Sequence, residues 1–138
     1  MSQKSYRWFT PSDIVDMARV FYKGTIHTDP FSETEANRIV KAKRFYTVEQ
    51  NGFDPRNPWV GNVFANPPGG KFQGQSRMGM ALARAVKEHN NMNSPMTQCI
   101  LLLKASIGYS WFLPVFLYPH CFLKEKPSFF DAAHPNKA

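Results

Sequence analysis

One apolar run stops so abruptly that it limits how the chain can fold. Residues 60–65 have the length and composition of a buried strand, and Asn66 and two prolines follow at once. The prolines fix the backbone angles after the strand, and the glycines at positions 69 and 70 allow a close approach. Because open α/β sheets bind ligands beyond the carboxyl ends of their strands, Asn66 is a candidate site residue. An Asn–Pro pair is also an ordinary turn signal, which leaves a purely structural role open.

The triplet Asn66-Pro67-Pro68 suits methyl transfer to an amino group whose lone pair is delocalised into a ring or carbonyl. Such a nitrogen is a weak nucleophile. The side-chain oxygen of Asn66 and the carbonyl of Pro67 could both accept its N–H bonds, which stabilises the charge that develops during attack. The prolines hold both acceptors at a fixed separation. We therefore predict Asn66, Pro67 and Pro68 as catalytic residues, and neither acceptor has to titrate.

Helical patterns alternate with these strands. Thr10-Pro11-Ser12-Asp13 is typical of a helix start in which Thr10 caps the helix, and the helix is expected to end at Gly24. Ser32 begins a second capping box that extends to residue 35. A third helix is expected over about residues 76–89. The buried face of the first helix is expected to comprise Ile14, Val15, Ala18 and Phe21.

Three further segments are expected to be strands, namely residues 25–28, 99–103 and 121–123. The first leads to Asp29, which could accept hydrogen bonds from ribose hydroxyls or an ammonium group, or could be a turn aspartate. Residues 71–75 are expected to form a polar loop over the substrate. The alternation of strands and helices predicts an α/β fold with a largely parallel sheet. Cys99 and Cys121 are too few for a disulfide framework or a zinc site, so we expect buried free thiols and no metal.

The composition favours one soluble domain with a polyanionic partner. The formal charge is +7, the isoelectric point is near 9.6, and the 14% aromatic residues would suit base stacking. Many proteins are nevertheless basic without such a partner. The start of the chain lacks a secretory signal, and no apolar run approaches the roughly 18 residues of a membrane span. We expect a single cytoplasmic domain over residues 1–138, with a core over about 6–130 and a tail over 131–138.

The order of these motifs resembles the phage-type DNA N-6-adenine methyltransferases, over about residues 6–130. The likeness rests on Trp8-Phe9-Thr10-Pro11, Asp29-Pro30-Phe31-Ser32, Phe45-Tyr46-Thr47 with Asn51-Gly52, Trp59-Val60-Gly61 and Asn66-Pro67-Pro68. The resemblance implies a Rossmann-like methyltransferase fold that uses S-adenosylmethionine and acts on DNA. It assigns Asn66 and Pro67 to the exocyclic amine of a flipped adenine. Its implied cofactor-binding residues are Thr10, Pro11, Asp29, Pro30 and Phe31.

The chain departs from the family pattern in three respects. Gly69 stands where the family usually has an aromatic residue that stacks on the flipped base, so we expect Phe72 to replace it and Lys71 and Gly69 to contact the substrate. The chain has no G-x-G loop, and it ends soon after Phe130, which predicts a short and possibly C-terminally truncated sheet. Two other functions stay open. One is the same chemistry on RNA or on a protein amide, and the other is a non-catalytic nucleic-acid-binding module.

Overall fold

The computed structural model describes residues 8–131, so residues 1–7 and most of the expected tail, 132–138, lie outside the described part. The elements in chain order are β1 (Trp8–Phe9), α2 (Ser12–Phe21), β2 (Thr28–Asp29), α3 (Asn37–Val40), β3 (Arg44–Phe45), β4 (Gly61–Ala65), β5 (Lys71–Phe72), β6 (Gln75–Ser76), α4 (Arg77–Asn90), β7 (Met96–Leu101), the 3-10 helix η1 (Ser110–Leu117) and β8 (Phe130–Asp131).

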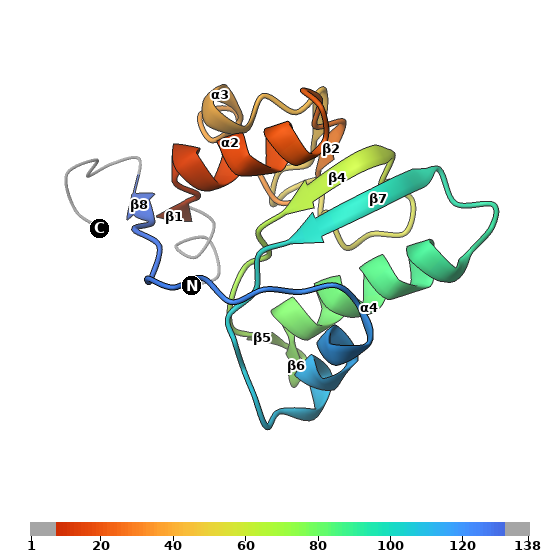
Figure 1. The fold of residues 1–138 in the computed structure, drawn as a ribbon. Helices are drawn as coiled ribbons and strands as arrows, with labels where there is room; N and C mark the ends of the chain where they lie inside the picture. The colour runs from red at the N-terminus through yellow and green to blue at the C-terminus, as the bar shows by residue number, and fades with distance from the viewer. Residues whose placement is uncertain (1–7, 132–138) are drawn as a thin grey trace.

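A four-stranded sheet with the strand order β3-β2-β4-β7 forms the middle layer. Each neighbouring pair is parallel, which confirms the prediction of an α/β fold with a parallel sheet. Helices α2 and α3 lie on one side of this sheet and α4 and η1 lie on the other (Figure 1). This three-layer arrangement is compatible with a Rossmann-like fold.

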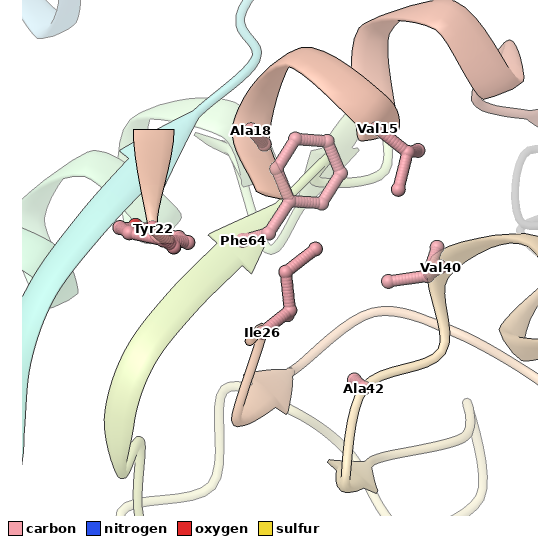
Figure 2. Packing of buried hydrophobic residues seen from close by; sticks show 7 residues of the cluster. All are labelled: Val15, Ala18, Tyr22, Ile26, Val40, Ala42 and Phe64. Carbon is pink, nitrogen blue, oxygen red and sulfur yellow. The ribbon is translucent and has the colours of Figure 1, made fainter. Parts of the chain in front are cut away.

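The core beneath α2 is built around Phe64 of β4, which points toward the helix (Figure 2). Val15, Ala18 and Tyr22 supply the buried face of α2. The prediction that Phe21 belongs to this face is wrong, because Phe21 is 68% exposed. Residues 15, 18 and 22 follow the helical repeat that meets the sheet, and position 21 is rotated away from it. The Tyr22 hydroxyl also donates to the Val63 carbonyl at 2.6 Å.

The opposite face of β4 packs against α4. Since side chains alternate along a strand, Val63 and Ala65 join a second cluster that contains Ala81 and Ala85 of α4. Helix α4 begins after Ser76, whose hydroxyl accepts the Gly79 N–H at 3.1 Å, close to the expected start. The remaining members of this cluster are Phe31, Tyr46 and Trp59.

The two expected capping boxes are not formed. Pro11 is the residue before α2, and α3 starts only at Asn37 after Ala36, each without a side-chain capping bond. Thr10 and Ser32 are instead buried. Both hydroxyls lie at the edge of the sheet, where tertiary contacts compete with local capping.

The C-terminal third differs most from the expectation. The strand expected at 99–103 is β7, Met96–Leu101, and it is only partly buried because it is the last strand of the described sheet. Residues 121–123 form no strand, and Cys121 is an exposed free cysteine. Burial raises the pKa of the partly buried Cys99 thiol to about 12. None of the helices within residues 8–131 has the length and apolar character needed to cross a membrane.

Candidate functional site

The candidate site lies where the strand order of the sheet reverses. The chain passes from β2 to β3 on one side and then returns to β4 on the other side of β2. The carboxyl ends of β2 and β4 therefore diverge into connections that run in opposite directions, which is where doubly wound sheets bind ligands. Asp29 is the last residue of β2, and Asn66 follows the last residue of β4.

A cavity of about 290 Å³ opens at this edge. Both ends of the described chain contribute to it, because β1 pairs antiparallel with β8 and brings Phe129 to the same cavity as Phe9. Most of the wall is apolar, and a few polar groups converge on it, as is usual for small-molecule sites. The lining residues are Phe9, Thr10, Asp29, Phe31, Ser32, Ala36, Val40, Asn66, Pro67, Pro68, Gly69, Met78 and Phe129.

The Asn66 side chain has a defined orientation. Its Nδ2 donates to the Oγ1 of the buried Thr10 at 2.9 Å. Within residues 8–131 no donor bonds to the Asn66 Oδ1, which is left as an acceptor on a residue that lines the cavity. The Thr10 hydroxyl therefore orients the amide of Asn66, which follows β4, instead of capping α2.

The loop after Asn66 is held from α4. The Arg77 Nε donates to the Gly69 carbonyl at 2.6 Å, and the Arg77 backbone N–H donates to the Gly70 carbonyl at 2.9 Å. With Pro67 and Pro68 already restricted, these bonds fix the loop at both ends. Arg77 is not among the predicted site residues, and its only sequence signal is its place at the start of the helix that follows Gly69 and Gly70.

Asp29 is the titratable side chain of the cavity wall, and its pKa is shifted far from the ordinary value. It is 4% exposed, and loss of solvation raises its pKa to about 7. Hydrogen bonds from the Phe31 N–H, at 3.0 Å, and from the Ser32 side chain act in the opposite direction and lower it. Because the pKa of Asp29 lies near neutral pH, a ligand that donates hydrogen bonds to this carboxyl or carries positive charge can ionise it.

The connection after β2 is braced from behind. A Cβ atom at Gly52 would lie 1.8 Å from the Pro30 carbonyl oxygen, so only glycine fits beside this segment. The Trp59 Nε1 holds Gly52 in place by donating to its carbonyl at 3.0 Å. The Phe31 ring lies 4.7 Å from the Phe53 ring, centroid to centroid. These contacts fix the backbone on which Asp29 and Phe31 enter the cavity.

The structure brings together most, but not all, of the residues predicted for the site. Those that line one cavity are Thr10, Asp29, Phe31, Asn66, Pro67, Pro68 and Gly69. Pro11 and Pro30 do not line it, because Pro11 precedes α2 and Pro30 is buried against Gly52.

Lys71 and Phe72 also lie outside the cavity wall. They form β5 of an exposed β5–β6 hairpin, so the segment 71–75, expected to be a polar loop, contains residues of two short paired strands. A Cβ atom at Gly69 would meet nothing within 4 Å, so this position itself contributes no ring to the cavity. The lining residues that the sequence analysis did not assign to the site are Phe9, Ser32, Ala36, Val40, Met78 and Phe129.

Within residues 8–131, no three His, Cys, Asp or Glu side chains are grouped closely enough to hold a metal ion. Comparisons of the chain with protein-family models, with curated proteins and with solved structures find no match. The site is therefore interpreted from its own geometry.

Proposed function

We propose that the chain is a methyltransferase that binds S-adenosylmethionine in this cavity and methylates the exocyclic amine of adenine in DNA. The observation that carries the proposal is the amide of Asn66, anchored through its nitrogen to Thr10 and presenting its oxygen beside the cavity that also contains Asp29. The resemblance to the phage-type adenine methyltransferases supports the same reading. Such a reaction would take place in the cytoplasm of a bacterial or phage-infected cell.

The lining residues fit an amphipathic cofactor. Apolar side chains such as Phe31 and Met78 would contact its ring and aliphatic parts, and the buried Asp29 would accept hydrogen bonds from its hydroxyl or ammonium groups. A ligand that donates to Asp29 would also remove the cost of ionising a desolvated carboxyl. When bound, S-adenosylmethionine supplies an electrophilic methyl group on a sulfonium.

The protein's part in the reaction is to hold the amine and to stabilise the charge that it develops. The Asn66 Oδ1 and the Pro67 carbonyl would accept the two N–H groups of the target amine, which directs its lone pair away from the ring. The hydrogen bond to Thr10 occupies the Asn66 amide nitrogen, so the amide oxygen would be the atom left to accept from the substrate. Pro67, Pro68 and the bonds from Arg77 keep both acceptors preorganised, so little reorganisation is needed during attack.

Charge favours a nucleic acid as the substrate without choosing DNA over RNA, and DNA is proposed from the family resemblance. A net charge of +7 favours a polyanion over a protein amide, and a base whose reacting atom is buried in a duplex has to be flipped out to reach a cavity.

One observation favours a different class of function. Gly69 stands where the resembled family has a stacking aromatic residue, and a non-catalytic nucleic-acid-binding module would tolerate that replacement. The two functions differ in whether methyl transfer occurs at all.

The test is to incubate the purified chain with methyl-labelled S-adenosylmethionine and unmethylated DNA, and to measure N-6-methyladenine in the digested DNA. Label in DNA that is lost in Asn66→Ala supports the proposal. Label in RNA or in protein under parallel conditions moves the assignment to those substrates. Cofactor binding without transfer to any of the three would leave the non-catalytic module.

A further inference from the structure

We infer that the β5–β6 hairpin is a nucleic-acid-contacting element in which Phe72 stacks on a base outside the cavity. This inference rests on the proposed function, because the hairpin begins a few residues after Asn66, at which the target base would react. It adds a contact that the cavity itself does not contain.

The hairpin is short and well defined. Lys71 pairs with Ser76 and Phe72 pairs with Gln75, so the turn consists of two residues. Gln73 and Gly74 both have positive φ, 51° and 79°, as in the type I′ turns that join tightly twisted strands. The exposed Phe72 ring is therefore carried on a restrained turn rather than on a disordered loop.

The base of the hairpin belongs to the cavity. Gly69 lines the cavity, and its carbonyl accepts the Arg77 Nε hydrogen bond. The Gly70 carbonyl accepts the Arg77 backbone N–H immediately before β5 begins. The hairpin is therefore fixed to the same loop that presents Asn66, only a few residues before Phe72.

Phe72 is 56% exposed and belongs to neither core cluster, so its ring is accessible to a ligand. Aromatic rings beside a single-stranded or flipped nucleotide bind bases without sequence preference, because every base has a π face. Gly69 carries no ring, so Phe72 is the first aromatic residue that follows Asn66 in this segment.

The charge of this half of the chain favours a phosphate backbone. Glu88 is the only Asp or Glu between residues 55 and 124, and it is paired with Arg84 at 2.8 Å. The same stretch has seven Lys and Arg residues. Lys71, on the hairpin itself, is exposed. Lys104 is also exposed, and its backbone N–H contacts the Sδ of Met78, a residue of the cavity wall, at 3.4 Å.

The experiment measures the anisotropy of labelled single-stranded DNA of about 16 nucleotides, without cofactor and at several salt concentrations. Phe72→Ala should weaken binding about 5- to 100-fold, and Phe72→Trp, which keeps a ring, should bind like the original chain. Phe21→Ala removes a phenylalanine of α2 that is more exposed than Phe72, and it should change affinity less than about twofold.

The charge of the hairpin is tested separately. Lys71→Gln should reduce the slope of log affinity against log salt by about 0.7, the value for one phosphate contact on a single strand. Lys87→Gln, which removes an exposed lysine near the far end of α4, should leave the slope unchanged.

Equal affinities for Phe72→Ala and Phe21→Ala, or no DNA binding by the original chain, would overturn the inference. This failure is distinct from failure of the proposed function. Methyl transfer with no dependence of binding on Phe72 rejects the hairpin alone. DNA binding that depends on Phe72, without any methyl transfer, rejects the enzyme alone.

Discussion

The neighbouring strands β2 and β4 end at the same edge of the sheet with side chains of opposite character. Asp29 at the end of β2 is buried and titratable, with a pKa raised to about 7. Asn66 after β4 is partly buried and neutral, and it is oriented by one hydrogen bond to Thr10. A change of pH should therefore affect this site through the protonation of Asp29 at the end of β2. A change in side-chain position should affect it through Asn66 after β4.

The largest expected effect is on kcat and comes from removing the Asn66 side chain, which follows β4. Asn66→Ala removes the acceptor without disturbing the core, so kcat should fall about 100- to 1000-fold while the Kd of the cofactor changes less than about threefold. Single-turnover methylation and calorimetry measure the two quantities. Asn90→Ala, an exposed change at the end of α4, is the control. Unchanged turnover in Asn66→Ala would contradict the role assigned to this amide.

The next effect belongs to β2. Asp29→Asn should weaken cofactor binding about 10- to 100-fold, because it replaces a charged acceptor by a neutral one. In the original chain the affinity should also fall as the pH drops below about 7, by up to about tenfold per unit, because binding must then ionise Asp29. Asp29→Asn should abolish that pH dependence. Calorimetry between about pH 5.5 and pH 8 gives both results, and an unaltered affinity would remove Asp29 from the site.

A smaller effect connects the two strand ends. Thr10→Val keeps the shape of the side chain but removes the oxygen that accepts the Asn66 Nδ2 hydrogen. Turnover should fall about tenfold, which corresponds to the loss of one neutral hydrogen bond. Thr10→Ser should restore most of it. If Thr10→Val and the original chain turn over at the same rate, the amide does not depend on this anchor.

The smallest expected effect is on stability. The folded-state pKa of Asp29 lies above its unfolded value of 3.8. The folded state therefore binds more protons between about pH 4 and pH 7, and its stability falls as the pH rises through this range. Asp29→Asn should remove this slope, and at about pH 8 the variant should be more stable than the original chain. Urea unfolding at several pH values checks it, with Asp54→Asn as the control because Arg56 lowers the pKa of Asp54 to about 2.

The sequence was sufficient to predict the sheet edge but not every role along it. Abrupt strand ends at Asp29 and Asn66 are local signals, because the residue types alone mark where an apolar strand stops, and both residues line the cavity. The prediction that Thr10 and Ser32 cap helices is wrong, because a hydroxyl has several possible partners. Only the tertiary structure decides between a neighbouring N–H and an amide 56 residues away.

Other errors have similar physical causes. Phe21 and Tyr22 are both aromatic, and the helical repeat from Val15 distinguishes them only once the sheet-facing direction of α2 is known. Cys121 lies in an apolar stretch that resembles a strand, yet no described neighbour pairs with it. Phe9 and Phe129 reach the cavity through the pairing of β1 with β8, a contact between segments that lie at opposite ends of the described chain.

The glycine at position 52 carries a consequence for how tolerant the molecule is to mutation. No atom of Gly52 lines the cavity, yet there is no room behind Pro30 for even a methyl group. An alanine there would have to push the Asp29–Phe31 segment forward, and the ligand would encounter a reshaped wall. Substitutions of Gly52 should therefore inactivate the protein, although this residue takes no part in the chemistry. The segment after β2 should be as sensitive to changes at Gly52 as to changes at the residues that line the cavity.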